Sequence, residues 1–347
     1  FMKALVYNKD FKNKIELKET DDPKILDPKD AIIKVEVSSI CTSDLHIIEG
    51  FVPRAKNNIA LGHEFSGTVI ETGSEVQKIK KGDRVSVNCI TFCNECYFCK
   101  KGFINNCEKG GWDLGCTING GHAEFARIPY ADSSLNKIPD NLSFENALFV
   151  GDILSSGYFA SKMIEIKKGD NIAIIGAGPV GLCSMVTSRI LGAKKITVID
   201  INQKRLEFAL NKGFCDYIIN PLIDNVEEKT KELTNKRGFD GVIEAAGGDN
   251  TFELSYKIAR ANSIIGVVAM YENNQILPLP NMYGKNLTFK TGGVDAIYCD
   301  ELLNLISKGI ISTDFLITKK FKFNDILEAY KLFKNKKDDD LKFAIYH

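Results

Sequence analysis

Four cysteines within one short stretch constrain the structure of this chain more than any other feature. They follow the spacing C-x2-C-x2-C-x7-C, as Cys93, Cys96, Cys99 and Cys107. Cysteines three residues apart on a tight loop can turn their sulfurs toward one point, whereas a disulfide would strain so short a loop. The spacing therefore predicts a metal cage, and zinc is the ion that it favours.

Two other interpretations of these cysteines rank below zinc. A bacterial iron–sulfur cluster uses a similar start, but that run closes after three residues and a proline, whereas this one closes after seven and is followed by Glu108. Four unrelated buried cysteines would require a coincidence. Because four thiolates leave no open position on the ion, we expect a structural zinc that stabilises a lobe at about residues 89–116.

Length and charge limit the class of protein. The chain has 347 residues, enough for two domains, and its 45 Lys and Arg balance 45 Asp and Glu. This balance argues against a nucleic-acid partner. The apolar stretch 171–188 is interrupted by glycines and Pro179, so we expect no membrane span. The first residues lack the apolar core of a signal peptide, and ten cysteines suit a reducing compartment, so we expect a cytoplasmic protein.

The hydrophobic pattern changes near residue 155. Before it, short β-branched runs separated by glycine turns predict a β-rich domain, with strands over 32–37, 67–71 and 84–87. After it, strands and helices alternate. Six strands are expected over 172–175, 196–199, 217–219, 241–244, 264–269 and 287–290.

Helices are expected from Pro179, from Gln203, over about 224–235 and after Asn250, where Glu253 is placed for a capping box. Together these elements predict an α/β Rossmann domain with a doubly wound parallel six-stranded sheet. The tail carries a further helix over 301–308 and a mixed-charge run, 334–340, that we expect to be a solvated loop.

A glycine-rich turn opens the second domain between a predicted strand and a predicted helix, as Gly176, Ala177, Gly178, Pro179, Val180 and Gly181. Gly176 permits the tight turn, Gly178 lets a pyrophosphate approach the backbone, and Gly181 lets the helix pack on the strand. Asp200 ends the next strand, where its carboxylate can accept hydrogen bonds from a ribose and repel a 2′-phosphate. NAD(H) is therefore favoured over NADP(H), although Lys204 and Arg205 keep dual use open.

A second group of metal-ligating residues lies in the β-rich domain. Cys41 begins the run to His46, and His63 follows about twenty residues later, flanked by Gly62 and Glu64. A thiolate, a neutral imidazole and a third acid would make a three-ligand zinc site with an open position, which is the catalytic arrangement. Each residue alone is ordinary, since a lone Cys or His is more often a packed core residue.

Taken together, the motifs resemble those of zinc-dependent medium-chain alcohol dehydrogenases over nearly the whole chain. They are the run from Cys41 to His46, Gly62 to Glu64, the four-cysteine lobe, Gly82 to Val85, and the glycine turn with Asp200. The resemblance implies a GroES-like β-barrel catalytic domain made of residues 1–155 and 293–347. It also implies an NAD-binding domain over 156–292, and a homodimer or homotetramer.

The resemblance also implies a role for each site residue. Cys41, His63 and Asp152 would bind the catalytic zinc, with Glu64 beside it as an alternate ligand or as a partner of the ligands. Asp44 would orient His63. Ser43 would accept the alcohol proton and pass it to His46, and a hydride would transfer to the nicotinamide. Thr42 and Arg205 would contact the cofactor.

The substrate is less constrained than the reaction. The Gly151 to Tyr158 segment and the run from Gly121 to Phe125 resemble the secondary-alcohol and formaldehyde-dehydrogenase-like branches, so a small or medium alcohol is expected. We interpret His122 as structural. A polyol, butanediol or threonine dehydrogenase of the same fold is the first alternative, and a non-catalytic NAD-binding protein is the second.

Overall fold

The computed structural model describes residues 1–347, and the chain divides into two compact units. Unit 1 contains Phe1–Ser155 and Asp295–His347, and unit 2 contains Ser156–Val294. Both ends of the chain therefore contribute to one unit, with the other inserted between them. No helix is long and apolar enough to cross a membrane.

Unit 1 is built mainly on two β-sheets. Its elements before the insertion are β1 (Met2–Tyr7), β2 (Ile15–Thr20), β3 (Ala31–Ser39), α1 (Thr42–Glu49), β4 (Ile59–Ala60), β5 (Glu64–Thr72), β6 (Arg84–Val87), α2 (Tyr97–Lys100), η1 (Ile104–Asn106), β7 (Phe125–Ile128), α3 (Ala131–Ser134), β8 (Leu135–Lys137), α4 (Phe144–Ala147) and the start of α5 (Ile153–Met163). After the insertion come α11 (Cys299–Ser307), η2 (Asp314–Leu316), β15 (Ile317–Lys322), η3 (Phe323–Asp325), α12 (Ile326–Lys334) and β16 (Lys342–Tyr346).

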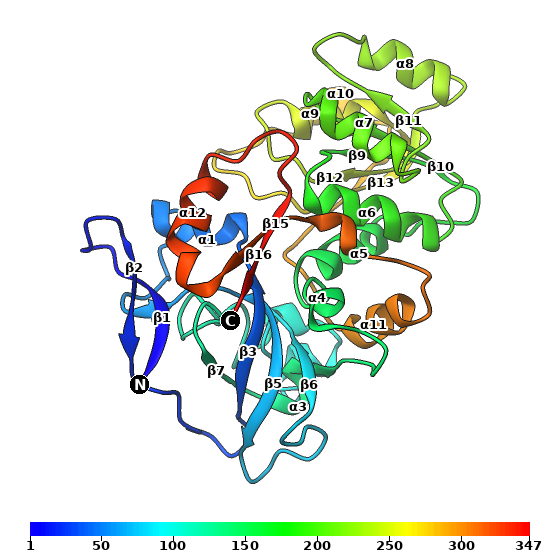
Figure 1. Ribbon diagram of the computed structural model, residues 1–347. Coiled ribbons are helices and arrows are strands. Elements are labelled where there is room, and N and C mark those ends of the chain that lie inside the picture. The colour runs from blue at the N-terminus through cyan, green and yellow to red at the C-terminus, as the bar shows by residue number, and fades with distance from the viewer. The chain divides into compact units, whose positions relative to one another are not determined.

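The larger sheet of unit 1 joins the two ends of the chain. Its strands run in the order β15-β16-β3-β5-β6-β8, and β7 pairs with β3. The red strand β16 lies beside the blue strand β3 in Figure 1, and the two are antiparallel with Ile345 opposite Ser38. A smaller sheet has the order β2-β1-β4. The alternating inward side chains of β3, such as Ile33 and Val35, are fully buried and form one core with β5 and β6.

Unit 2 contains one parallel sheet with helices in the connections. Its elements are the rest of α5, β9 (Asn171–Ile175), α6 (Pro179–Ile190), β10 (Lys195–Ile199), α7 (Gln203–Asn211), β11 (Tyr217–Ile219), α8 (Val226–Leu233), β12 (Phe239–Glu244), α9 (Thr251–Ile258), β13 (Ala259–Val267), α10 (Leu279–Met282) and β14 (Thr288–Thr291). The strand order β11-β10-β9-β12-β13-β14, with all pairs parallel, is that of a doubly wound dinucleotide-binding fold. The predicted six-stranded sheet is confirmed.

Two local predictions were wrong. Glu253 forms no capping box, because Asn250 is not in the extended conformation that a cap needs and Glu253 instead pairs with Lys257 at 2.6 Å. The tail segment 334–340 is not wholly a solvated loop. Helix α12 continues to Lys334, and Asp340 is buried in an ion pair with Lys319 at 2.7 Å.

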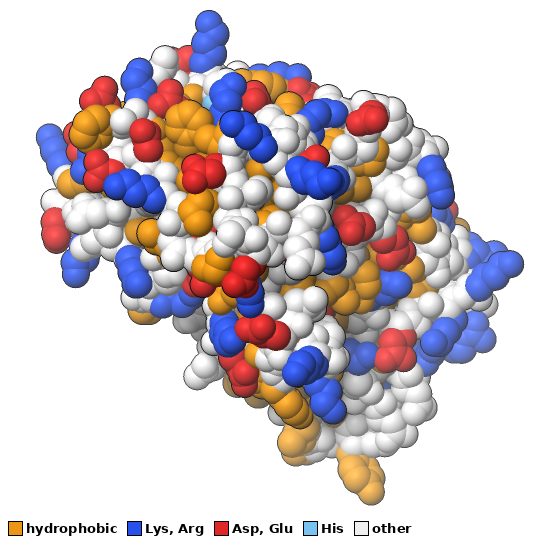
Figure 2. Space-filling model, turned by 90° about the horizontal axis from the view of Figure 1, so that it is seen from below, with side chains coloured by type: hydrophobic (Ala, Val, Ile, Leu, Met, Phe, Trp, Pro, Cys, Tyr) orange, Lys and Arg blue, Asp and Glu red, His pale blue; other side chains and the backbone are white.

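Charged side chains of both signs are mixed over the face that Figure 2 shows, with no large area of one sign. The chain has equal numbers of basic and acidic residues, and on this face the two kinds are interspersed. This face therefore offers no electrostatic footprint for a polyanion.

Candidate metal and cofactor sites

The four cysteines of the lobe bring their sulfurs to one point. The Sγ atoms of Cys96 and Cys107 lie 4.0 Å apart, and those of Cys107 and Cys93 lie 3.6 Å apart. All four ligand atoms, including that of Cys99, lie within 4.8 Å of one another. A zinc–sulfur bond of about 2.3 Å in a tetrahedron gives an Sγ–Sγ separation of ~3.8 Å, whereas a disulfide would need ~2.05 Å. The geometry fits a four-thiolate zinc site.

Backbone amides favour the thiolate form of these cysteines. The Cys93 and Lys109 N–H groups donate to Cys107 Sγ at 3.3 and 3.4 Å. A backbone N–H bond from Glu108 is the main cause that lowers the pKa of Cys96 to about 6. Burial raises the pKa of Cys99 and Cys107 despite such donors, so a bound cation is needed to favour the thiolate form of all four cysteines.

Cys41, His63 and Asp152 form a second cluster in unit 1. Cys41 is the N-cap of α1, two residues after the end of β3, whereas His63 directly precedes β5 and Asp152 directly precedes α5. All three are buried and their ligand atoms lie within 4.8 Å of one another. His63 Nε2 and Asp152 Oδ2 are 3.2 Å apart, close to the ~3.3 Å edge of a tetrahedron with zinc bonds of about 2.0–2.1 Å.

The electrostatics of this cluster require positive charge. Burial lowers the pKa of His63, but the charges of Asp44, Asp152 and Cys41 outweigh it and raise the pKa well above the ordinary value. In the absence of another cation, a proton on His63 would supply the missing charge. A divalent ion can take over this role, because a neutral imidazole, a thiolate and a carboxylate are zinc ligands. The residues therefore fit a three-ligand zinc site.

Asp44 connects two of the ligand-bearing segments. Its Oδ1 lies 3.2 Å from His63 Nδ1, and its Oδ2 accepts the Cys41 N–H at 2.9 Å. The carboxylate is fully buried, and its contacts with His63 hold its pKa far below the ordinary range despite burial. The Nδ1 side of the His63 ring therefore faces Asp44, which leaves Nε2 for a metal.

Glu64 takes part in a buried ion pair that the sequence did not indicate. Its Oε1 lies 2.6 Å from Lys342 Nζ, and the two side chains are 0% and 2% exposed. Its Oε2 accepts the N–H of Ile153, the residue after Asp152, at 3.1 Å. Burial raises the pKa of Glu64 to about 7, although Lys342 opposes this shift. The structure thus places Glu64 between β16 and the segment that carries Asp152, outside the three-residue cluster.

Breaking this pair has a large expected cost. In Lys342→Met, the buried Glu64 carboxylate loses its ion-pair partner, so we expect a loss of about 3–5 kcal/mol in the free energy of unfolding. The double variant Glu64→Gln with Lys342→Met removes both charges and should recover most of that loss. Urea unfolding followed by circular dichroism measures both.

A matched surface pair provides the control. Lys320 lies 2.9 Å from Glu145 in the same unit, but the two side chains are 57% and 32% exposed. Lys320→Met should therefore cost less than about 1 kcal/mol. Equal unfolding midpoints for Lys342→Met and the unmodified protein would show that the buried pair does not stabilise unit 1.

The residues predicted to move the proton lie on α1. Ser43 Oγ is 3.8 Å from Cys41 Sγ, so it borders the metal cluster. His46 follows one turn later, its Nδ1 is buried without a partner, and its ring meets Phe51 edge-on at 6.2 Å. Thr42 is exposed at the start of the same helix. Trp112, which the sequence did not single out, packs edge-on against His63 with ring centroids 5.4 Å apart.

The glycine turn of unit 2 has the geometry that its residues predict. Gly176 has φ +105°, in the region that favours glycine, and a Cβ on Gly181 would lie 1.9 Å from Gly176 O. A Cβ on Gly178 would meet nothing within 4 Å, so the backbone there is open to a ligand. Pro179 occupies the first turn of α6, whose N-terminus favours an anion.

Asp200 is hydrogen-bonded to the backbone of this turn. Its Oδ2 accepts the Ala177 N–H and its Oδ1 accepts the Asn202 N–H, both at 2.7 Å. Each oxygen keeps a further lone pair for a ribose hydroxyl. Arg205 is partly buried in the first turn of α7, and Lys204 beside it is exposed.

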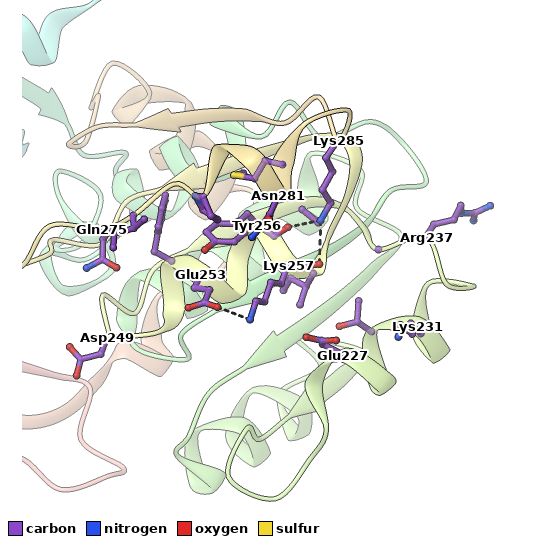
Figure 3. A pocket seen from close by; sticks show the side chains of 18 of the residues that line it. Glu227, Lys231, Arg237, Asp249, Glu253, Tyr256, Lys257, Gln275, Asn281 and Lys285 are labelled. Carbon is purple, nitrogen blue, oxygen red and sulfur yellow. Dashed lines mark hydrogen bonds and ion pairs between the residues drawn. The ribbon is translucent and has the colours of Figure 1, made fainter.

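A separate surface groove of unit 2 contains none of these residues. It has a volume of about 940 Å³ and is lined by α8, α9, α10 and the segment 273–278 (Figure 3). Several of its charged groups are already partnered. Lys257 pairs with Glu253 at 2.6 Å, and Lys285 Nζ donates to the Tyr256 carbonyl at 2.6 Å. These partners give Lys257 and Lys285 structural roles at the end of α9.

A dinucleotide-binding sheet in one unit and a three-ligand metal cluster in the other define the class of metal-dependent dehydrogenases. Comparison with known proteins agrees. Residues 27–140 match the alcohol dehydrogenase GroES-like domain, and residues 179–306 match the zinc-binding dehydrogenase domain.

Full-length relatives identify the family. The chain is 32% identical to an alcohol dehydrogenase of Cupriavidus necator, over 99% of this chain and 98% of that protein. It is 29% identical to the NADP-dependent isopropanol dehydrogenase of Thermoanaerobacter brockii, over 91% and 92% of the two chains. The solved apo structure of zinc-dependent alcohol dehydrogenase 2 from Streptococcus pneumoniae superposes with a TM-score of 0.93 at 34% identity, covering 100% of this chain and 99% of that one.

The chain therefore belongs to the zinc-dependent medium-chain alcohol dehydrogenase family. The predicted family and the predicted fold class, a GroES-like domain with a Rossmann domain, are confirmed. The protein is an oxidoreductase of the alcohol dehydrogenase type, as its motifs predicted.

Proposed function

We propose that this protein transfers a hydride between a small or medium alcohol and NAD(H), with an aldehyde or ketone as the oxidised product. The observation that carries the proposal is the buried cluster of Cys41, His63 and Asp152, whose spacing and charge suit a cation with an open position. A zinc ion held there supplies a Lewis acid that lowers the pKa of an alcohol hydroxyl toward neutrality.

The side chains near this cluster have distinct tasks. Asp44 fixes the orientation of His63. Ser43 accepts the hydroxyl proton, and His46, on the same face of α1, exchanges it with solvent. Glu64 supports the Asp152 segment through the Ile153 N–H, while Lys342 holds its carboxylate. The four-cysteine lobe binds a second, structural zinc, so we infer two zinc ions per chain.

The cofactor is held in unit 2. The free N–H groups at the start of α6 would bind the pyrophosphate, with Gly178, Pro179 and Val180 forming the turn beside it, and Asp200 would accept hydrogen bonds from the ribose hydroxyls. We infer a preference for NAD(H), because a 2′-phosphate beside the Asp200 carboxylate would be repelled. Relatives of the NADP-dependent kind exist, so the test must compare both cofactors. Thr42 and Arg205 are proposed as further cofactor contacts.

An aromatic surface beside the metal cluster favours an alcohol with an apolar chain. The Trp112 ring packs against His63, and the Arg54 guanidinium lies over that ring at 5.4 Å while donating to the Trp112 carbonyl. These contacts hold the indole in one orientation. A polyol, a butanediol or threonine would place hydroxyl or charged groups against this indole, whereas a simple alcohol would place its hydrocarbon chain there. The contact therefore supports a small or medium alcohol as the substrate.

We also infer a cytoplasmic location and a homodimer or homotetramer. Five of the seven proposed zinc ligands are thiols, and reduced thiols persist in a reducing compartment. The oligomeric state is implied by the family and is measurable by light scattering.

One preparation can test the proposed function. We expect elemental analysis to find about two zinc ions per chain. An absorbance screen of isopropanol, butanol, butanediol, sorbitol and threonine should give the highest kcat/KM with a simple alcohol. The ratio of kcat/KM for NAD over NADP should be at least about tenfold, because a bond from ribose to a charged carboxylate contributes roughly 1.5–3 kcal/mol.

Three outcomes would contradict the proposal in different ways. Best turnover of sorbitol, butanediol or threonine would favour the polyol-type alternative. Bound NAD and two zinc ions without turnover of any alcohol would favour a non-catalytic protein. A preference for NADP would contradict the role assigned to Asp200. If that role is correct, Asp200→Asn should lower the ratio of kcat/KM for NAD over NADP.

A further inference from the structure

Two buried histidines of unit 1 share one serine hydroxyl. Ser38 Oγ lies 3.1 Å from His122 Nδ1 and 3.0 Å from His347 Nε2. Ser38 is on β3 and is 0% exposed, as is His122. His347 follows β16, where its ring stacks on Phe323 with centroids 4.3 Å apart. None of these three residues belongs to the metal cluster or to the proposed proton path.

The second nitrogen of His122 faces the metal cluster. His122 Nε2 lies 3.9 Å from Asp44 Oδ2 and has no other polar partner. The ring packs edge-on against Tyr330, with centroids 5.7 Å apart at 90°. It also lies against Gly62, where a Cβ would come within 2.7 Å of His122 Cγ. The imidazole is therefore fixed between the Asp44 carboxylate and the peptide that precedes His63.

The direction of each hydrogen bond follows from Asp44. At 3.9 Å the contact between His122 Nε2 and Asp44 Oδ2 is a charge contact and not a hydrogen bond, and the ionised carboxylate favours the tautomer that carries its proton on Nε2. His122 Nδ1 is then the acceptor and takes the Ser38 O–H. The Ser38 oxygen in turn accepts from His347 Nε2–H. Burial lowers the pKa of His347 to about 3, which keeps that ring neutral.

The other oxygen of Asp44 faces the proposed metal ligand His63. Asp44 Oδ2 receives the Cys41 N–H and faces His122, so Oδ1 is left for His63 Nδ1 at 3.2 Å. Polar contacts therefore connect His347 to His63 in the order His347, Ser38, His122, Asp44 and His63. A buried carboxylate without enough polar neighbours would be costly, so each contact helps to hold Asp44 in place.

We propose that His122 is a positioning residue for the metal cluster. Together with Ser38 and His347, it holds Asp44 so that His63 presents Nε2 to the metal. This inference rests on the proposed function, since it assumes that Cys41, His63 and Asp152 bind a metal. It adds residues from β3, from the segment before β7 and from the end of β16 to those that determine the affinity of the site.

The test compares His122→Phe with His122→Gln. Phenylalanine keeps the ring contact with Tyr330 but loses both nitrogens, whereas a glutamine amide can still donate toward Asp44. We expect His122→Phe to weaken zinc binding at the three-ligand site by about tenfold, and His122→Gln to restore much of the affinity. Competition with a chelator measures the dissociation constant. The visible spectrum of the Co²⁺-substituted site reports its geometry independently of activity.

If His122→Phe does not fold, a substitution that removes fewer atoms can test the same proposal. Ser38→Ala removes only one hydroxyl and should weaken the same site in the same direction, by less. Ser66→Ala is its matched control, because Ser66 is a buried serine on the neighbouring strand β5 that donates to the Phe144 carbonyl. Ser66→Ala should leave zinc affinity unchanged.

The possible failures are distinguishable. If the unmodified protein binds no metal besides that of the four cysteines, the proposed function fails and this inference fails with it. If it binds two metals and the His122→Phe or Ser38→Ala site keeps the same affinity and Co²⁺ spectrum, only this inference is wrong.

Discussion

Cys41→Ser should remove the zinc ion of the three-ligand site and nearly all alcohol oxidation. The thiolate supplies one of three protein ligands and part of the charge that balances the ion. Without the Lewis acid, several kcal/mol of transition-state stabilisation disappear, so we expect kcat/KM to fall by at least about 10³-fold. Zinc content should fall from two ions per chain to one. NAD binding, measured by calorimetry, should remain close to that of the unmodified protein because all of its proposed contacts except Thr42 are in unit 2.

Cys215→Ser is the control for this experiment. Cys215 is a buried cysteine of unit 2, where burial raises the pKa of its thiol to about 11, and it belongs to neither metal cluster. It should keep two zinc ions and full activity. Full activity in Cys41→Ser would show that the catalytic assignment is wrong, and a loss of NAD binding would show that the variant had disturbed more than the metal.

Cys96→Ser should unfold the four-cysteine lobe. The lobe has a small core made of the four cysteines with Phe92 and Ile104, so the metal supplies most of its folding energy. Structural zinc binding contributes about 10–16 kcal/mol in small domains. Even if only ~4 kcal/mol of this is coupled to the rest of unit 1, Tm should fall by roughly 10 °C. Differential scanning calorimetry measures this change.

Proteolysis locates the effect of Cys96→Ser. Lys100 and Lys101 are exposed but lie at the end of helix α2, so trypsin should cut there rapidly only when the lobe has lost its metal. Zinc content should fall by one ion while the Co²⁺ spectrum of the three-ligand site persists in the folded fraction. An unchanged Tm with two zinc ions bound would contradict a structural role for the cage.

Local sequence patterns predicted the parts of this protein that depend on short-range geometry. The four cysteines are close in the chain, so their spacing alone indicated a cage. In unit 2, alternating strands and helices with Gly176 and Gly181 predicted the six-stranded sheet, because each unit of that fold is continuous in sequence. Cys41 and His63 were grouped by their chemistry as metal ligands, and Asp152 was assigned as the third ligand only through the family resemblance, since nothing local brings the three together.

Long-range partners were not predictable in the same way. Lys342 resembles an ordinary solvated lysine in a basic tail, and only the pairing of β16 with β3 buries it beside Glu64. Ser38 and His347 are 309 positions apart. Helix α12 and strands β15 and β16 were missed because their mixed charges hide the buried positions Phe333 and Phe343. When a short helix or strand carries charged residues on its exposed side, its sequence pattern resembles that of a loop.

The placement of the last β-strands has a consequence for biosynthesis. Residues 295–347 follow unit 2 in the chain, yet they complete the sheet of unit 1 and bring Lys342 to Glu64. At typical translation rates the synthesis of these residues takes roughly 3 to 10 s after unit 2 is complete. During that interval the nascent unit 1 lacks the countercharge for Glu64, so ribosome-bound chains carry an unfinished metal pocket until the closing strand arrives.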